Sequence, residues 1–242
     1  MKPAMSRGMG AAPLYPIVNV SQPGATAAAR ATALALALAE AGLPWLQLRA
    51  KPLGTGEYAS LARSLVAKLD AYDCRLIVND RADVALAAGA WGLHVGDEDL
   101  PVVAARALLG SACLIGFSTH AVDEVSAACR PSAEARADDP ADRPQRHPLD
   151  YIGFGPVFES PTKAGVRAAR GLRLLAQACR ASSVPVVAIG GITVETAPLC
   201  WRAGAACVAV ISELERAFEA DRLDDLLRRY RDAALAHGLP SF

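Results

Sequence analysis

The stretch VPVVAIGGITVETAPLCWRAGAACVAVIS, residues 184–212, contains the unit that decides the fold. It opens with a short apolar run that predicts a strand over Val184–Ile189, and a helical pattern follows over Val194–Ala203. A second apolar run predicts another strand over Cys207–Val210. A strand, a helix and a strand in this order form a βαβ unit, whose strands are parallel and whose crossover is right-handed.

The same alternation continues toward the N-terminus. Further strands are predicted by short runs rich in β-branched residues at Leu14–Val20, Trp45–Leu48, Arg75–Val78, Gly92–Val95, Cys113–Phe117 and Tyr151–Phe154. Helical patterns lie at Ala25–Ala41, Gly56–Tyr72, Ala82–Ala88, Leu100–Leu109, Val122–Ala128 and Leu172–Arg180, and one more, Leu214–His237, follows the last strand. Eight such units predict an α/β protein that closes into a single (β/α)₈ TIM barrel, and a doubly wound open sheet is the alternative.

Length and composition agree with this fold and exclude several functions. The chain has 242 residues, which suits a barrel of this type because such a barrel runs to roughly 250 residues as a single unit. Lys and Arg together number 25, as do Asp and Glu together, so no bulk charge favours nucleic acid or an anionic membrane as a partner.

None of the six cysteines forms a Cys-x-x-Cys pair, which predicts reduced thiols. With no apolar leader or membrane-length run, we expect a cytoplasmic protein, and a homo-oligomer is compatible with the sequence.

Two segments are predicted to lie outside the regular barrel. Residues 1–12 are expected to form a flexible tail, which leaves 13–242 for the barrel domain. Pro131–Pro148 is rich in Pro, Ala, Asp, Glu and Arg and has no apolar period, which predicts a mobile insertion between a helix and a strand. Such connections lie on the face opposite the active site of a barrel, so we expect no catalytic part for it. A partner-binding role is the alternative.

Polar residues follow each predicted strand, where the active sites of such barrels lie. After the second strand, alternation places Gln47, Arg49 and Lys51 on one side, toward the barrel mouth. Two cations and an amide on one face suit a polyanion such as diphosphate. An ordinary solvated strand end is the alternative.

Acidic residues follow the third and fourth strands. Asp80 comes after the third strand and Asp99 after the fourth, so the two carboxylates can converge. Mg²⁺ favours one or two carboxylates together with phosphate oxygens, which predicts a magnesium site beside the cationic face. The alternative is that each aspartate caps the helix that follows it.

The later strands end in hydroxyls, a cation and glycines. Ser118 and His120 follow the fifth strand, and the histidine is either a general base or a hydrogen-bonded structural group. The long loop after the sixth strand carries two hydroxyls and a cation, in the residues Ser160, Pro161, Thr162 and Lys163. Gly190–Gly191 follows the seventh strand and Ile211–Ser212 the eighth. Backbone N–H groups in these last two loops often bind phosphate, which glycine lets approach closely.

Taken together, these motifs resemble the thiamine-phosphate synthase family, also called thiamine-phosphate pyrophosphorylase. The strings that carry the resemblance are QLRAK at 47–51, VNDR at 78–81, GLHVGDEDLP at 92–101, GFSTH at 116–120, YIGFGPVFESPTK at 151–163, AIGGI at 188–192 and VAVIS at 208–212. They extend the resemblance over roughly residues 14–214, and the run from Ser160 to Lys163 is the most specific of them.

The resemblance implies a Mg²⁺-dependent transferase that acts on small phosphorylated molecules. Hydroxymethylpyrimidine diphosphate and a thiazole phosphate, with or without a carboxylate on the thiazole, would give thiamine phosphate and diphosphate. It implies that the pyrimidine diphosphate contacts Gln47, Arg49, Lys51, Asn79, Ser118 and Lys163. The thiazole phosphate would be held by Ser160, Thr162, Gly191, Ile211 and Ser212, with Pro161 between the two hydroxyls. Asp80 and Asp99 would ligate Mg²⁺, and Arg49, Lys51 and Lys163 would stabilise the departing negative charge.

Three positions depart from the family pattern, and two other functions remain as alternatives. Ser160 stands where Thr is usual, Asp97 where Gln is common, and Asn19 where Asp is common. The first change keeps the hydroxyl, and the second adds negative charge near the metal. One alternative function is a thiazole tautomerase that uses His120 as its acid–base group. The other is a non-catalytic phosphate-binding barrel with a regulatory role.

Overall fold

Eight parallel strands close into one barrel in sequence order, from β1 round to β8, which pairs with β1. The computed structural model describes residues 12–130, 148–159 and 168–242. The strands are β1 Leu14–Asn19, β2 Trp45–Arg49, β3 Arg75–Asn79, β4 Gly92–Val95, β5 Leu114–Thr119, β6 Tyr151–Phe154, β7 Val186–Ile189 and β8 Cys207–Val210. The predicted (β/α)₈ barrel is therefore confirmed, and the open-sheet alternative is excluded because the sheet has no edge.

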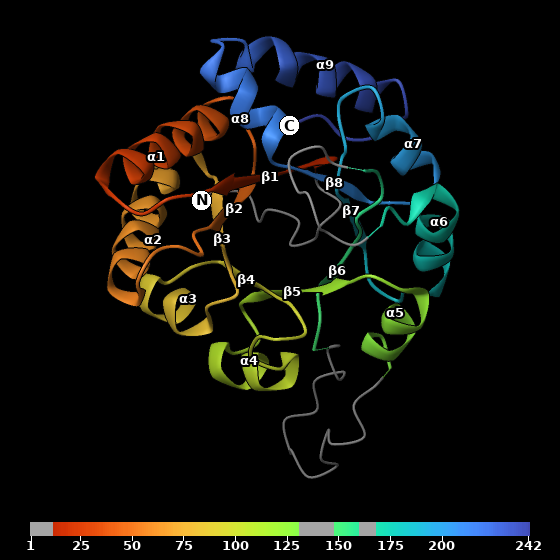
Figure 1. The fold of residues 1–242 in the computed structure, drawn as a ribbon, viewed down its shortest axis with the longest axis horizontal. Helices are drawn as coiled ribbons and strands as arrows, with labels where there is room; N and C mark the ends of the chain where they lie inside the picture. Colours follow the sequence, from red (N-terminus) through yellow and green to blue (C-terminus); the bar gives the residue numbers. More distant parts are fainter. Residues whose placement is uncertain (1–11, 131–147, 160–167) are drawn as a thin grey trace, which may run out of the picture.

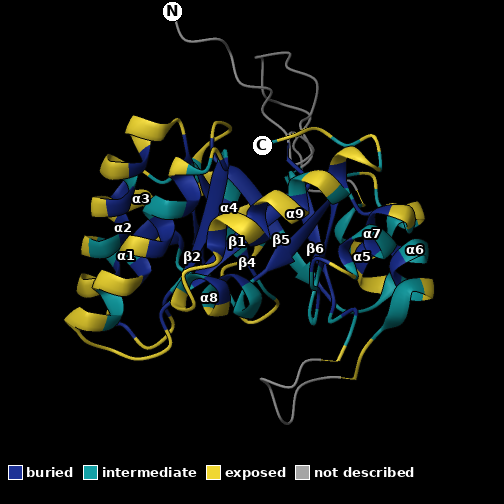
Figure 2. Cartoon of the chain, turned by 90° about the horizontal axis from the view of Figure 1, so that it is seen from above, coloured by how far each residue is buried: buried dark blue, intermediate teal, exposed yellow. Residues whose placement is uncertain are grey.

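Helices form a ring around the barrel (Figure 1). They are α1 Ala25–Glu40, α2 Thr55–Leu69, α3 Ala82–Ala88, α4 Val102–Leu109, α5 Val122–Ala128, α6 Gly171–Ala181, α7 Ala197–Arg202, α8 Ser212–Glu219 and α9 Leu223–Leu235, with a 3₁₀ turn at Asp70–Tyr72. Figure 2 shows the consequence for burial, because the strands lie buried at the centre while the outer faces of the helices are exposed.

The helical pattern over Leu214–His237 is not continuous in the structure. It divides into α8 and α9 because Asp221 adopts a left-handed backbone conformation with φ 53°, which ends the first helix. The Arg222 N–H then donates to the Ala217 carbonyl at 2.8 Å and closes the turn. Aspartate tolerates this conformation better than most residues, but the hydrophobic period alone does not reveal it.

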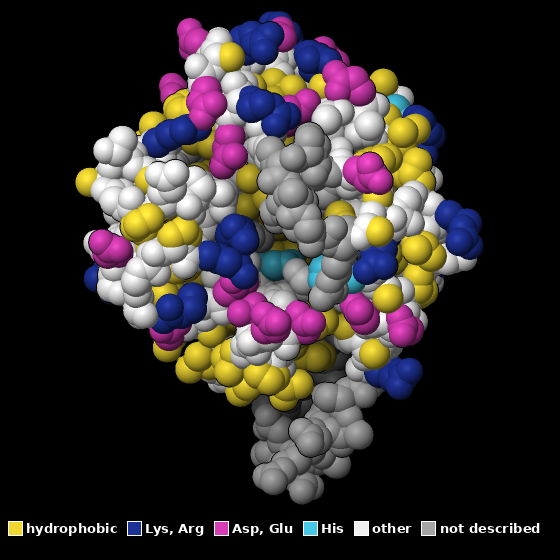
Figure 3. Space-filling model, viewed as in Figure 1, with side chains coloured by type: hydrophobic (Ala, Val, Ile, Leu, Met, Phe, Trp, Pro, Cys, Tyr) yellow, Lys and Arg dark blue, Asp and Glu magenta, His cyan; other side chains and the backbone are white. Residues whose placement is uncertain are grey.

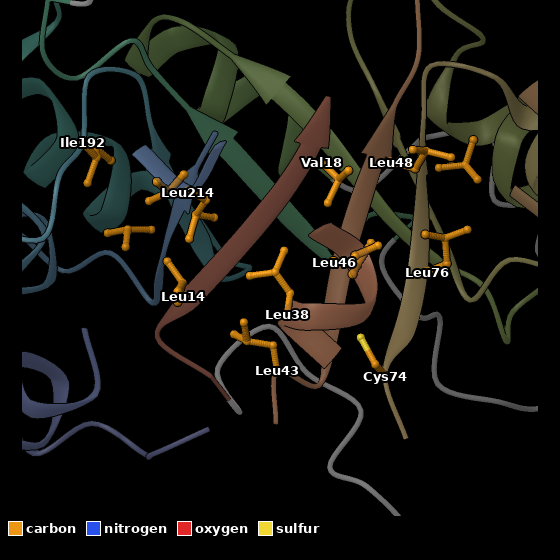
Figure 4. Close-up of a cluster of buried hydrophobic side chains, with 14 of the residues drawn as sticks. Leu14, Val18, Leu38, Leu43, Leu46, Leu48, Cys74, Leu76, Ile192 and Leu214 are labelled. Atoms are coloured by element: carbon orange, nitrogen blue, oxygen red, sulfur yellow. The ribbon is translucent and has the colours of Figure 1, made fainter. Parts of the chain in front are cut away.

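Alternation along each strand separates two cores. The outward side chains pack under the helices, and Figure 4 shows Leu14 and Val18 of β1 beside Leu46 and Leu48 of β2 in this layer. The inward side chains form a smaller cluster inside the barrel, which includes Tyr15, Ile77 and Tyr151. The second set positions the candidate site, because every inward residue near a strand end faces the same central space.

The outer core sets the first testable expectation. Leu46 is fully buried against the helices, so Leu46→Ala should lower the free energy of unfolding by about 2–5 kcal/mol. The exposed Leu86 on α3 provides the matched control, and Leu86→Ala should change this free energy by less than about 0.5 kcal/mol. Urea denaturation of both variants measures the two values. Equal losses for the two leucines would contradict the assignment of Leu46 to the core.

The two segments predicted to leave the barrel are mostly outside the described residues. This holds for residues 1–11 and for residues 131–147 of the Pro131–Pro148 insertion. Ala12 is buried within the inner cluster, and Pro148 is half-buried. Among the described residues, no helix is both long enough and apolar enough to span a bilayer.

Candidate active site

A cavity of about 130 Å³ opens at the carboxyl ends of the strands. All eight strands contribute inward-facing residues, and the polar ones are Tyr15, Gln47, Arg49, Asn79, His94, Ser118 and Tyr151. Figure 3 shows the hollow at the barrel centre, with histidine at its floor and with cationic and acidic side chains adjoining on the side of β2, β3 and β4. The cavity therefore lies where the sequence placed the active site, at the carboxyl end of a parallel barrel.

The cationic side of the cavity comes from the end of β2. Gln47 and Arg49 both face inward and line the cavity, as the alternation predicted. The Arg49 guanidinium donates to the Asn19 side-chain oxygen at 2.8 Å, so the end of β1 holds the arginine in place. No role was predicted for Asn19. Among the described residues no carboxylate forms an ion pair with Arg49, which leaves its charge available to an anion.

The acidic side of the site brings Asp80, Asp99 and Lys51 together. The Lys51 Nζ lies 3.0 Å from Asp80 Oδ2, and the side-chain amide of Asn79 donates to Asp80 Oδ1 at 2.7 Å. The Asp80 backbone has φ 66°, and its N–H donates to the His94 carbonyl at 2.7 Å. This turn directs Asp80 across to the loop after β4, as the sequence predicted for two neighbouring strands.

Asp99 completes an acidic pair with Asp80. The Gly96 N–H donates to Asp99 Oδ2 at 2.8 Å and fixes the carboxyl group. Burial raises the pKa of Asp99, and the negative charge of Asp80 together with a hydrogen bond between the two carboxyl groups raises it further, while the Gly96 N–H and Lys51 act against this. The neighbouring Asp97 and Glu98 are exposed. Two adjoining carboxyl groups of this kind attract a cation.

Neither aspartate caps a helix. The N-cap of α3 is Arg81 and that of α4 is Pro101, and neither helix has a side-chain capping hydrogen bond. The capping alternative is therefore wrong, because Asp80 accepts from Asn79 and pairs with Lys51 while Asp99 accepts the Gly96 N–H.

The donor set fits a hard divalent cation that the substrate also ligates. Asp80 and Asp99 offer two carboxylates, and the described residues contain no group of three or more His, Cys, Asp or Glu side chains that would form a metal site by itself. Mg²⁺ keeps several ligands outside the protein and often uses one or two carboxylates with phosphate oxygens. Such an ion would therefore be held only jointly with an anionic ligand.

Asn79 supplies an unused polar group beside this pair. Its side chain is 8% exposed, and no described group donates to its Oδ1. The backbone around it is fixed by Tyr58, which receives the Asn79 N–H at 3.1 Å and donates to the Leu48 carbonyl at 2.7 Å. A buried acceptor without a donor costs free energy, so a ligand donor or a water molecule at this atom would stabilise it.

The glycine loop after β7 and the start of α8 form another part of the mouth. Gly190 and Gly191 have φ values of 100° and 63°, and a Cβ on Gly191 would lie 2.4 Å from the Glu159 carbonyl oxygen. Ile211 lines the cavity, and α8 begins at Ser212 with no side-chain cap. The first N–H groups of that helix therefore have no side-chain capping acceptor.

Of the other residues predicted for the site, Ser118 and His120 belong to the described part of the chain, and the residues predicted from the loop after β6 do not. Ser118 lines the cavity and lies 2.9 Å from His94 Nε2. His120 is not among the described residues that line it; its Nδ1 lies 2.7 Å from the Gly155 carbonyl oxygen. The loop residues Ser160, Pro161, Thr162 and Lys163 lie outside the described part of the chain.

Three cavity residues were not predicted. Tyr15, His94 and Tyr151 occupy inward positions of β1, β4 and β6. Burial lowers the pKa of His94 to about 4, although the charge of Asp80 opposes this shift. The alternation of inward and outward side chains along each strand could have identified two of them. His94 lies two residues before Gly96, and Tyr151 lies two residues before Gly153, so each shares the face of a residue nearer the carboxyl end of its strand.

A closed parallel barrel with a polar cavity at its carboxyl end defines the class of (β/α)₈-barrel enzymes. The profile of a protein family described as thiamine monophosphate synthase matches residues 14–214. A thiamine-phosphate synthase of Anaeromyxobacter dehalogenans is 40% identical over 190 residues, which cover 73% of this chain and 78% of the relative. One from Albidiferax ferrireducens is 40% identical over 175 residues, which cover 72% and 73% of the two chains.

A solved structure gives the same result. The thiamine phosphate pyrophosphorylase of Pyrococcus furiosus superposes with a TM-score of 0.71 at 26% identity, and the alignment covers 93% of this chain and 96% of that one. The chain belongs to the thiamine monophosphate synthase family, a family of transferases. The resemblance seen in the sequence motifs is confirmed.

Proposed function

We propose that this enzyme joins hydroxymethylpyrimidine diphosphate to a thiazole phosphate, with or without a carboxylate on the thiazole, and releases diphosphate. The observation that carries the proposal is the clustering of Asp80, Asp99 and Lys51 beside the inward-facing Arg49 and Gln47 at one side of the cavity. Carboxylates and cations adjoining each other in this way suit a diphosphate bound through Mg²⁺.

The reaction requires charge stabilisation and no protein nucleophile. The bond between the pyrimidine methylene carbon and the diphosphate oxygen breaks, and its electron pair leaves with the diphosphate. The electron-rich aminopyrimidine carries the resulting positive charge until the lone pair of the thiazole nitrogen forms the new carbon–nitrogen bond. When bound, Mg²⁺ would supply positive charge to the leaving diphosphate.

The chain's own residues then have distinct roles. Arg49 and Lys51 would contact the diphosphate oxygens and gain most as negative charge develops on them. Gln47 would orient the pyrimidine inside the cavity, whose apolar lining from Ile17, Val187 and Ala209 excludes water around the cation. Ser118 and Asn79 would offer further hydrogen bonds to this substrate.

The thiazole phosphate would bind on the opposite side of the mouth. Gly191, Ile211 and Ser212 lie there, at the loop after β7 and the start of α8. Backbone N–H groups at a helix start can donate hydrogen bonds to a phosphate without a cationic side chain. The roles that the resemblance gives to Ser160, Pro161, Thr162 and Lys163 stay predictions, because these residues lie outside the described part of the chain.

A turnover assay with both substrates tests the proposal. The enzyme should form thiamine phosphate with Mg²⁺ and lose activity in excess chelator, with recovery when Mg²⁺ is restored. Isomerisation of a thiazole phosphate without Mg²⁺, abolished by His120→Ala, would support a tautomerase instead. Tight binding of both substrates without any product would support a non-catalytic barrel.

A further inference from the structure

Five polar side chains inside the barrel form one continuous hydrogen-bond chain, which we name the polar chain. Gln47 Nε2 donates to Tyr15 Oη at 2.9 Å, and Tyr15 Oη lies 2.9 Å from Tyr151 Oη. Tyr151 Oη lies 2.9 Å from His94 Nδ1, and His94 Nε2 lies 2.9 Å from Ser118 Oγ. The polar chain thus joins Gln47 on β2 to Ser118 on β5, and both of these residues line the cavity.

The first bond fixes the direction of all the others. Because Tyr15 receives a proton from Gln47, its own hydroxyl proton must go to the partner that remains, Tyr151. Tyr151 must then donate to His94 Nδ1, so that His94 is neutral and carries its proton on Nε2. His94 therefore donates to Ser118, and the Ser118 hydroxyl proton is left to point at a ligand.

The opposite direction presents the opposite groups to the cavity. If Ser118 donated to His94, every bond would reverse, and Tyr15 would donate to the Gln47 amide oxygen. Gln47 would then turn its NH₂ group toward the cavity, and Ser118 would offer only lone pairs. In the direction that follows from the Gln47 donor, Gln47 offers its amide oxygen, which receives no hydrogen bond from any described residue, and Ser118 offers a proton.

We infer that the polar chain couples the two ends of the cavity and selects a ligand with an amine at the Gln47 end and an anionic oxygen at the Ser118 end. The inference rests on the proposed function in one respect, since an aminopyrimidine diphosphate is such a ligand. Binding of the amine at Gln47 holds the direction that also turns the Ser118 proton toward the diphosphate. Tyr15, Tyr151 and His94 are therefore positioning residues that act through Gln47 and Ser118.

The barrel is shaped to hold the polar chain in place. A Cβ on Gly116 would lie 2.0 Å from the Tyr151 ring, and one on Gly153 would lie 3.2 Å from His94 Cε1, so both glycines leave room for these rings. The Tyr151 ring meets Tyr15 edge-on with centroids 5.9 Å apart, and His94 stacks on it at 5.4 Å. Tyr15 and Tyr151 are almost fully buried, so their hydroxyls have no access to bulk water as an alternative partner.

A double-mutant cycle measured by binding tests the coupling. The variants are Gln47→Met and Ser118→Ala, singly and together, and the readout is the dissociation constant of pyrimidine diphosphate with Mg²⁺ by calorimetry. Residues that act independently give additive effects, whereas the polar chain should give a coupling of about fivefold or more. In a Tyr151→Phe background the same cycle should be additive to within about twofold, because the chain is cut while the ligand still touches both ends.

Controls separate coupling from a general loss of structure. Tyr230→Phe removes a buried hydroxyl outside the polar chain, one that donates to Glu213 at 2.6 Å, and it should leave the coupling intact. Tyr15→Phe cuts the chain at a second point and should abolish the coupling if Tyr151→Phe does not fold. Tyr151→Phe should weaken pyrimidine diphosphate binding about tenfold and change thiazole phosphate binding less than about twofold.

The outcomes distinguish this inference from the proposed function. Additive effects in the parent protein, or a coupling that survives both tyrosine substitutions, would overturn the coupling even if turnover is normal. Absence of turnover with both substrates would overturn the proposed function, while the binding cycle would still decide the coupling.

Discussion

Asp80→Asn is expected to lower kcat by about 10²–10³-fold and to remove the dependence of the residual rate on Mg²⁺. The reason is that Asp80 faces both Asp99 and Lys51. Under the proposed function it would supply charge to the cation and would also order the lysine that is proposed to contact the diphosphate. Asparagine keeps the shape of the side chain and tolerates the left-handed backbone at φ 66°, which alanine would strain. The measurement is steady-state turnover over a Mg²⁺ titration.

A neighbouring acid provides the control for Asp80. Asp83 lies on α3, is largely exposed and pairs with Arg81, so Asp83→Asn should change kcat by less than about twofold. Thermal unfolding of both variants excludes a folding defect. If Asp80→Asn kept the parent rate and its Mg²⁺ dependence, the acidic pair would have no part in metal binding.

Arg49→Ala is the second substitution with a large expected effect, a fall of about 10²–10³-fold in kcat. Arg49 lines the cavity, is held by Asn19 and has no carboxylate partner among the described residues. In the proposed reaction its charge would be available to the departing diphosphate. In the proposed reaction this interaction would strengthen as the carbon–oxygen bond breaks, so kcat should fall more than the substrate affinity does. Steady-state kinetics with the pyrimidine diphosphate varied separate the two effects.

Two further variants sharpen the test of Arg49. Arg49→Lys keeps the charge but loses the forked donors, so its rate should fall between those of the parent and the alanine variant. Arg81→Ala removes an arginine that pairs with Asp83 and donates to Thr55 outside the cavity, and it should leave the rate nearly unchanged. A loss confined to substrate affinity in Arg49→Ala would assign Arg49 to ground-state binding alone.

Most of the barrel could be predicted because its strands are apolar runs bounded by polar ends. The predicted bounds of β4, β6 and β8 agree with the structure residue for residue. Strand β7 begins at Val186, two residues after the predicted start, because Pro185 has no N–H to donate to the sheet. The division between α8 and α9 escaped prediction because it depends on the backbone of Asp221 and not on periodicity.

The residues at the mouth of the barrel could be predicted because strands that follow one another in the sequence are neighbours in the barrel. The inward positions of Gln47 and Arg49 follow from alternation, and the meeting of Asp80 with Asp99 follows from the pairing of β3 with β4. The contact between Tyr15 and Tyr151 inside the barrel could not be predicted in this way. Tyr15 and Tyr151 meet across the barrel although 136 residues separate them, and their bond depends on the closure of the sheet and on the space beside Gly116.

In the proposed site, Asp80 and Asp99 would hold one divalent cation beside the cationic side of the cavity, where it would supply positive charge to the diphosphate. A crystal structure with Mn²⁺ and diphosphate tests it directly, since Mn²⁺ accepts the same oxygen ligands as Mg²⁺ and scatters anomalously. An anomalous peak between the two carboxylates, with diphosphate oxygens on Arg49 and Lys51, is the expected result. A diphosphate bound elsewhere, or bound there with no peak beside Asp80, would contradict the account.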